Sequence, residues 1–97
     1  MLKGNQKRYL KGLANPISHR YLLGKGEIDE SFLSQIDAAL EAKELIKVGL
    51  NGNCSLAPKE AGEILSSKTG AELVQIIGHV IVLYRRSKKN PKIVLPQ

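Results

Sequence analysis

The chain has 97 residues, of which 42% are hydrophobic and 25% are charged, with a net charge of +6 and a pI near 9.6. A chain of this length buries one core, which predicts a single domain over residues 1–97 and leaves no room for a separate catalytic domain. The composition excludes a disordered chain. The longest apolar stretch, residues 80–84, is too short to span a bilayer, and no apolar core of signal-peptide length begins the chain. We therefore expect no membrane partner and a cytoplasmic location.

The charges are unevenly distributed along the chain. Residues 1–25 carry six basic side chains and no acidic one, residues 26–63 carry three lysines against eight carboxylates, and residues 64–97 carry six basic side chains against Glu72 alone. If both ends of the chain lie on one side of the fold, they form a positive face opposite an acidic one. This pattern indicates a polyanionic partner.

The first predicted elements are a helix and a short strand. Residues 3–14 carry apolar Tyr9, Leu10 and Leu13 at helical spacing, with basic side chains on the remaining surface. Pro16 ends this helix, because the residue before a proline is pushed away from helical geometry. A strand is expected at residues 20–23.

The middle of the chain predicts a second helix, a strand and a third helix. Asp29 can cap a helix over residues 29–43, in which apolar side chains recur on one face. Alternating apolar and polar residues then predict a strand at 46–50. Pro58 suits the first turn of a third helix, and Gly70 suits its C-terminal cap.

The last two strands are predicted to form a hairpin. Residues 73–77 and 80–84 are β-branched runs that only Gly78 and His79 separate, so they should pair antiparallel. The complete order is helix-strand-helix-strand-helix-strand-strand, an α/β fold whose strand-helix-strand units imply parallel pairing. From about residue 85, five basic side chains in eight predict a mobile basic C-terminal arm, with docking of its apolar residues 93–95 on the domain as the alternative.

The segment GKGE at residues 24–27 joins the first strand to the second helix and can cradle a phosphate. Glycines at such a junction let the backbone approach a ligand, and the first amides of a helix have no partner within it. The amides of Gly24 and Gly26 and the side chain of Lys25 are therefore candidate phosphate contacts. A simple turn is the alternative interpretation, and the surrounding positive charge favours phosphate binding.

Three stretches of the chain resemble one family: KRYLKGLAN at residues 7–15, ALEAKELIKV at 39–48 and LVQIIGHVIVLYR at 73–85. The family is the CRM domain (chloroplast RNA splicing and ribosome maturation), in its stand-alone bacterial YhbY-like form. The resemblance implies a four-stranded mixed sheet packed on three helices, similar to the C-terminal domain of translation initiation factor three. It also implies RNA binding and, for single-domain bacterial members, association with precursors of the large ribosomal subunit.

Members of this family usually carry G-x-x-G between the first strand and the second helix, a loop compared with the one that KH domains use to clamp a nucleic-acid backbone. Gly24 matches the first glycine of that loop, whereas Glu27 occupies the position of the second. The loop alone should bind weakly, because carboxylates outnumber the one lysine beside it. His79 stands where the family often has arginine, and its charge would depend on pH.

The resemblance also changes the interpretation of the basic side chains in the first helix, which would otherwise be read as solvated surface residues. We expect them to lie near one edge together with the glycine segment and the residues that follow the last strand. The predicted RNA-binding set is Gly24, Lys25, Gly26, Lys7, Arg8, Lys11, Arg20, His79, Arg85 and Arg86.

No catalytic residue, metal site or cofactor is predicted, and no small-molecule substrate is expected. Neither His19 nor His79 has a cysteine or carboxylate at a motif spacing, and Cys54, the only cysteine, reads as a small apolar filler. A single cysteine excludes an internal disulfide and favours a reducing compartment. The aromatic residues lie in apolar runs and are predicted to be core or core-edge residues: Tyr9, Tyr21, Phe32 and Tyr84.

These observations favour a non-enzymatic RNA-binding protein that binds precursor ribosomal RNA of the large subunit, or a pre-large-subunit particle, through backbone phosphates. One alternative is a protein adaptor whose acidic middle docks on a basic ribosomal protein. Another is a basic DNA-binding protein of similar architecture.

Overall fold

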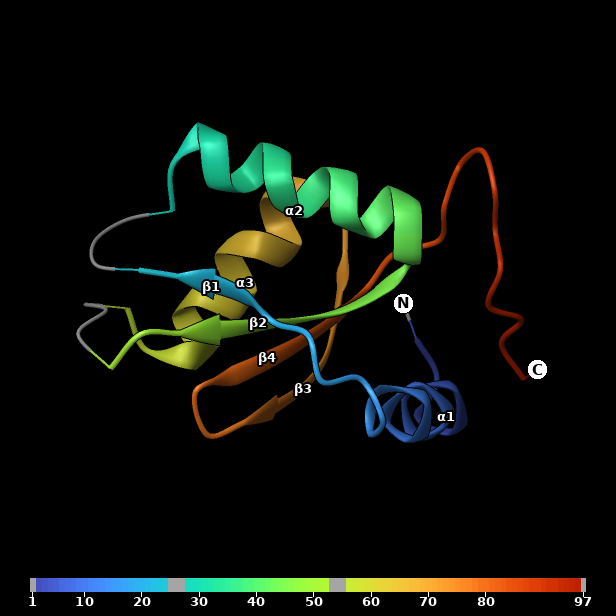
Figure 1. Ribbon diagram of the computed structural model, residues 1–97. Coiled ribbons are helices and arrows are strands. Elements are labelled where there is room, and N and C mark those ends of the chain that lie inside the picture. Colours follow the sequence, from blue (N-terminus) through green and yellow to red (C-terminus); the bar gives the residue numbers. More distant parts are fainter. Residues whose placement is uncertain (1, 25–27, 53–55, 97) are drawn as a thin grey trace.

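The computed structural model is a four-stranded sheet with helices on both of its faces (Figure 1). The structure describes residues 2–24, 28–52 and 56–96, so that Lys25, Gly26, Glu27 and Cys54 lie outside the described residues. The α/β class and the element order predicted from the sequence are confirmed. The bounds are α1 Gly4–Ala14, β1 Tyr21–Leu23, α2 Glu30–Lys43, β2 Leu45–Leu50, α3 Pro58–Thr69, β3 Glu72–Ile77 and β4 Val80–Tyr84.

Local sequence sets the ends of α2 and α3 as predicted. The side chain of Asp29 accepts a hydrogen bond from the amide of Phe32 at 2.8 Å, which satisfies one of the free donors at the start of α2. Pro58 is the first residue of α3. Gly70 ends that helix at a φ of 76°, in the left-handed region that glycine adopts without strain.

The strand order in the sheet is β1-β2-β4-β3. β1 pairs parallel with β2, and β4 pairs antiparallel with both β2 and β3. The predicted β3–β4 hairpin and the parallel pair of the first strand-helix-strand unit are therefore confirmed. The second unit, β2-α3-β3, keeps its two strands parallel in direction, but they do not pair because β4 lies between them.

The sheet separates two hydrophobic cores. The larger core lies between the sheet and the helices α2 and α3, and the smaller core lies between the sheet and α1. Alternation along β2 and β4 sends successive side chains to opposite faces and so supplies both cores from the same strands. The buried residues of the smaller core are Leu10, Ala14, Leu45, Val74, Val82 and Tyr84.

The C-terminal arm, residues 85–96, is docked on the domain. Ile93 and Leu95 pack against the smaller core, and the side-chain amide of Gln6 in α1 donates to the carbonyl oxygen of Pro96 at 3.0 Å. The C-terminal end of the chain consequently lies on the same side of the molecule as α1 and the N-terminus (Figure 1). Of the two states considered from the sequence, the docked one is found.

The burial of the aromatic residues agrees with the prediction except at Tyr9. Phe32 and Tyr84 are buried and Tyr21 is half-buried, whereas 43% of Tyr9 is exposed. The prediction was wrong for Tyr9 because Leu10 and Ala14, one turn apart, form the buried line of α1. A residue next to Leu10 is rotated by about 100° away from that line.

Candidate nucleic-acid interface

Gly24 and His79 lie at the same end of the sheet. Gly24 follows β1 directly, and the amide of Asn51 donates to the carbonyl oxygen of Leu23 at 2.9 Å. The amide of Leu50 donates to the carbonyl oxygen of His79 at 2.8 Å. The end of β1, the turn after β2 and the turn of the β3–β4 hairpin therefore meet at one edge, which we call the glycine end. The structure thus brings two of the predicted site residues together.

The basic side chains of α1 lie away from its buried line. Lys7 and Lys11 are one helical turn apart, and Arg8 lies beside them on the same flank of the helix. Arg8 and Lys11 are exposed and Lys7 is half-buried. Among the residues that are described, none of the three is in an ion pair, so their charges are available to an external anion.

Arg20 lies over β2 on the same face of the sheet as α1. The Cβ and Cδ atoms of Arg20 lie 3.8 and 3.6 Å from the point that a Cβ on Gly49 would occupy, so the missing side chain leaves room for Arg20. Lys47 extends this basic surface, because the pleat of β2 directs it away from the larger core. Its Nζ donates to the carbonyl oxygen of Ile17 at 2.8 Å.

Sequence reasoning did not include Lys47 in the site. The signal was available, since Lys47 stands between Ile46 and Val48, two residues of the larger core. A side chain between two core residues of a strand points to the opposite face, where α1 lies.

Arg85 and Arg86 lie at the other end of the sheet from Gly24. Both follow Tyr84, which pairs with Leu45 at the start of β2, whereas Gly24 lies beyond the end of β2. A strand with the length of β4 separates the two ends by roughly 15 Å. The structure therefore does not bring these two arginines to the glycine end.

Arg85 is held within the fold. Its guanidinium pairs with the carboxylate of Asp37, donates to the carbonyl oxygen of Thr69 at 2.8 Å and lies 4.0 Å from a carboxylate oxygen of Glu41. Only 15% of its side chain is exposed. Arg85 thus connects the end of β4 to α2 and α3, and these contacts occupy most of its donors.

Two carboxylates at the end of α2 hold the C-terminal arm. Glu44 is buried and accepts hydrogen bonds from the amides of Ser87, Lys92 and Ile93 at 2.7 to 2.8 Å. Burial alone would raise the pKa of Glu44, but the three amide hydrogen bonds outweigh it and lower that pKa below its usual value.

Glu41 makes the second set of contacts with the arm. Its carboxylate accepts from the hydroxyl of Ser87 at 2.7 Å and from the amides of Lys88 and Lys89. These hydrogen bonds, with the one from Ser87 foremost, lower the pKa of Glu41 to about 2. Sequence reasoning missed both glutamates. Their position near the C-terminus of a helix, where the dipole disfavours negative charge, was the available signal.

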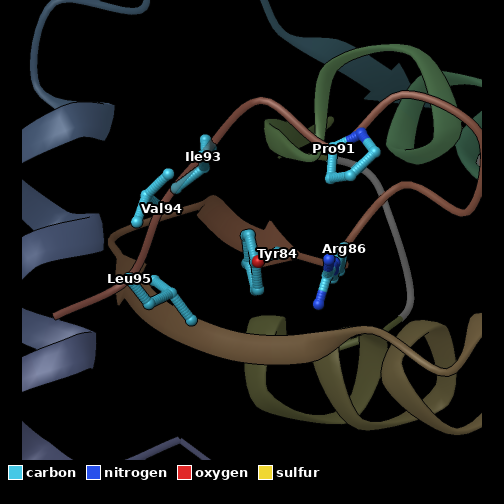
Figure 2. A pocket seen from close by; sticks show the side chains of 6 residues that line it. All are labelled: Tyr84, Arg86, Pro91, Ile93, Val94 and Leu95. Carbon is cyan, nitrogen blue, oxygen red and sulfur yellow. The ribbon is translucent and has the colours of Figure 1, made fainter. Parts of the chain in front are cut away.

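A pocket of about 420 Å³ lies between the arm and the end of β4 (Figure 2). Burial and the negative charge of Glu44 raise the pKa of the Tyr84 phenol in its wall, so this phenol stays neutral. Arg86 is exposed at the pocket and contributes its one cation. The lining residues are Tyr84, Arg86, Pro91, Ile93, Val94 and Leu95.

The described parts of the chain contain no group of three or more histidine, cysteine or acidic side chains that could hold a metal ion. No helix within residues 2–24, 28–52 and 56–96 has the length and apolar character needed to cross a bilayer.

An α/β domain with a four-stranded mixed sheet and three helices is the architecture expected for the family that the sequence resembles. The CRS1 / YhbY (CRM) domain matches residues 2–85, and the chain belongs to this family. The solution structure of the hypothetical protein SAV1595 from Staphylococcus aureus is 51% identical in sequence and superposes with a TM-score of 0.82, covering 99% of this chain and 100% of that one.

Curated relatives cover the chain almost completely. The protein named probable RNA-binding protein YqeI of Bacillus subtilis is 43% identical over 96 residues, which are 99% of this chain and 100% of the relative. A protein of Haemophilus influenzae named RNA-binding protein is 39% identical over 100 residues, covering 99% of this chain and 96% of the relative. Both relatives are named for RNA binding and not for an enzymatic activity.

Proposed function

We propose that this chain is a non-enzymatic RNA-binding protein whose interface is the surface formed by α1, Arg20, Lys47 and the glycine end, here called the α1-side surface. The observation that carries the proposal is the separation of charge by the sheet. Residues 2–24 on the α1 side hold five basic side chains and no acidic one, whereas residues 29–44 on the opposite side hold five carboxylates and one lysine. A polyanion would therefore approach the α1 side first.

The proposed contacts are with backbone phosphates. Lys7, Arg8 and Lys11 would bind one stretch of RNA, and Arg20 would bind the stretch that leads to Gly24 at the glycine end. Such contacts position an RNA without reading its sequence, which suits recognition by charge and shape. Arg86 and the lysines of the arm would contact phosphates further along the RNA, while Arg85 supports the fold that carries them.

The finer part of the proposal concerns the RNA itself. Stand-alone bacterial members of the family that this chain resembles are associated with precursors of the large ribosomal subunit, and we propose the same RNA in the cytoplasm for this chain. Crosslinking in cells followed by sequencing of the attached RNA tests this choice. Reads concentrated in precursors of the large-subunit RNA would support it, and reads spread evenly over cellular RNA would contradict it.

RNA binding through the α1-side surface is tested by two triple variants of equal net charge. Replacing Lys7, Arg8 and Lys11 by glutamine should lower the log-log salt slope of binding by about 2, since each phosphate contact to a single strand contributes about 0.7. The matched control replaces three exposed lysines on the opposite side of the sheet by glutamine. These are Lys43, Lys59 and Lys68.

The control variant should keep the affinity and the slope of the unmodified protein. Equal losses in both variants would mean that only net charge matters, and the proposed surface would then be wrong. A competition between RNA and DNA strands of the same sequence separates an RNA-binding protein from a general nucleic-acid binder. A preference for DNA would contradict the proposal.

A further inference from the structure

We infer that the part of the α1-side sheet face nearest the glycine end is an apolar platform for the unpaired bases of single-stranded RNA. The inference rests on the proposed function and names the form of RNA that this surface takes. It is carried by a row of four residues, one from each strand of the sheet. The row, called the apolar row here, consists of Leu22, Gly49, Val80 and Ile77.

The register of the sheet places these four residues side by side. Leu22 is paired with Gly49, Gly49 with Val80, and Val80 with Ile77. Their neighbours Leu23, Val48 and Ile81 belong to the larger core on the opposite face. Because side chains alternate along a strand, the row must point toward the face on which α1 lies.

α1 does not cover this row. The strand residues buried with α1 lie further along the strands, at Leu45, Val74, Val82 and Tyr84. In the apolar row, Leu22 is 71% exposed and Ile77 is 50% exposed. Figure 1 shows α1 near the start of β2, away from the ends of β1 and β2 that carry the row. Leu22 and Ile77 stand at the two ends of the row, and half-buried Val80 lies between Ile77 and Gly49. An apolar surface that continues across several strands marks a site for binding.

Gly49 is buried beneath the side chains of Leu22 and Arg20, which occupy the room that its missing side chain leaves. A Cβ at Gly49 would lie 3.1 Å from the Cδ2 atom of Leu22, closer than ordinary van der Waals contact. Without that atom, the side chain of Leu22 can lie across β2 toward Val80. The row spans three strand spacings, about 14 Å. Four-stranded sheets of other RNA-binding domains seat two or three bases on aromatic side chains, whereas this row offers aliphatic ones.

The charges around the row favour RNA over an apolar protein partner. Arg20 packs beside Gly49, and His79 lies in the turn between Ile77 and Val80. The row itself carries no charge, and Gly24 lies two residues after Leu22, at the end of β1. An RNA strand whose phosphates contact Arg20 and the glycine end would direct its bases toward the row. The bases of a duplex are stacked inside the helix and cannot reach such a platform.

The inference is tested with the double variant Leu22→Thr and Ile77→Thr, which removes apolar contact without changing charge. We expect its affinity for a single-stranded RNA of about ten nucleotides to fall five- to tenfold, with the salt slope unchanged. Its affinity for a fully paired RNA duplex should stay the same. The matched control is Val94→Thr in the arm, where 81% of the valine is exposed, and its affinity for both RNAs should be unchanged.

The outcomes distinguish this inference from the proposed function. If Lys7, Arg8 and Lys11 are needed for binding but the double variant binds single strands normally, the platform is wrong and the RNA-binding surface stands. If the unmodified protein binds neither RNA, the proposed function itself fails. Sedimentation of the protein alone provides one further readout. Loss of self-association in the double variant, with RNA affinity unchanged, would make the row a protein interface and overturn the inference.

Discussion

Glu44 joins the end of α2 to the C-terminal arm through a single buried carboxylate. Its backbone φ of 67° is the one positive value outside glycine among the described residues. With a ψ of −42°, Glu44 occupies a sparsely populated backbone region that costs a residue with a side chain about 1–3 kcal/mol. The amides of Ser87, Lys92 and Ile93 hold the carboxylate in place, and this set of charge-assisted hydrogen bonds offsets the cost.

Replacing Glu44 by glutamine should lower the free energy of unfolding by about 2–3 kcal/mol at pH 7. Glutamine keeps the shape of the side chain, but it loses the charge and turns an NH2 group toward amide donors. Urea denaturation followed by circular dichroism measures the change. Glu63→Gln, on an exposed position of α3, is the control and should shift the value by less than about 0.5 kcal/mol. An equal effect of both variants would contradict the role of the buried carboxylate.

The lowered pKa values of Glu44 and Glu41 determine how the free energy of unfolding should depend on pH. The pKa values of Glu44 and Glu41 are lowered in the folded protein, from an ordinary value of 4.5. The unfolded chain therefore binds protons first, and the stabilisation is present above pH 4.5 and is lost as the pH falls below it. In Glu44→Gln, the decrease of the unfolding free energy between pH 5 and pH 3 should be smaller than in the unmodified protein.

At the scale of elements, α3 approaches the sheet closely at Gly62. A Cβ at this position would lie 3.1 and 3.3 Å from the two methyl carbons of Leu73 and 3.5 Å from Ile81. Gly12 in α1 has no such neighbour within 4 Å. Both glycines lie within helices. Close packing against the sheet explains why a glycine is needed at position 62, whereas no neighbouring atom requires a glycine at position 12.

The same substitution at both glycines tests this difference. Gly12→Ala should stabilise the protein by about 0.5–1 kcal/mol, because alanine favours the helix and meets no atom. Gly62→Ala should show none of that gain, and Gly62→Val should destabilise by about 1–3 kcal/mol through overpacking. Thermal and urea unfolding provide the values. Stabilisation by Gly62→Ala equal to that at Gly12 would show that α3 does not need the close approach.

The elements themselves were predictable because their signals are local. Asp29, Pro58 and Gly70 mark helix ends through their own side chains or backbone freedom, and β-branched runs mark β3 and β4. The insertion of β4 between β2 and β3 is not local. The strand order depends on which arrangement buries the apolar side chains of both cores. Neither the composition nor the spacing of residues along the chain indicates that order.

The candidate site was predictable only in part, for the same reason. Gly24 follows β1, and His79 lies in the turn that connects β3 to β4. The two residues lie close together because β1 and this turn end at the same end of the sheet. The position of Arg85 depends on partners 16 and 48 residues away, Thr69 and Asp37, which no motif spacing indicates. The docking of the arm similarly depends on Glu41 and Glu44, whose role appears only when the end of β4 is placed beside the end of α2.

At the scale of the whole molecule, the basic side chains of residues 2–24 and the carboxylates of residues 29–44 lie on opposite sides of the sheet. Asp37 forms an ion pair with Arg85, and Glu41 and Glu44 accept hydrogen bonds from the arm. These three carboxylates of the acidic side therefore stabilise the fold. Glu30 and Glu63 lie exposed on α2 and α3. The latter two carboxylates can act on an approaching RNA only through their long-range field.

Exposed carboxylates that do not contact the RNA should still change the rate at which RNA associates with the protein. Replacing Glu30 and Glu63 by glutamine should raise the association rate with RNA two- to threefold near 10 mM salt and leave the dissociation rate unchanged. The molecule is 24 Å across its shortest direction, and the Debye length at 10 mM salt, about 30 Å, exceeds it.

Stopped-flow binding at two salt concentrations provides the measurement. At 0.5 M salt the screening length falls to about 4 Å, so the variant and the unmodified protein should associate at the same rate. An effect that persists at high salt, or that appears in the dissociation rate, would place these carboxylates at the interface. The acidic side would then contact the RNA directly, and the assignment of one face of the sheet to RNA and the other to the fold would be wrong.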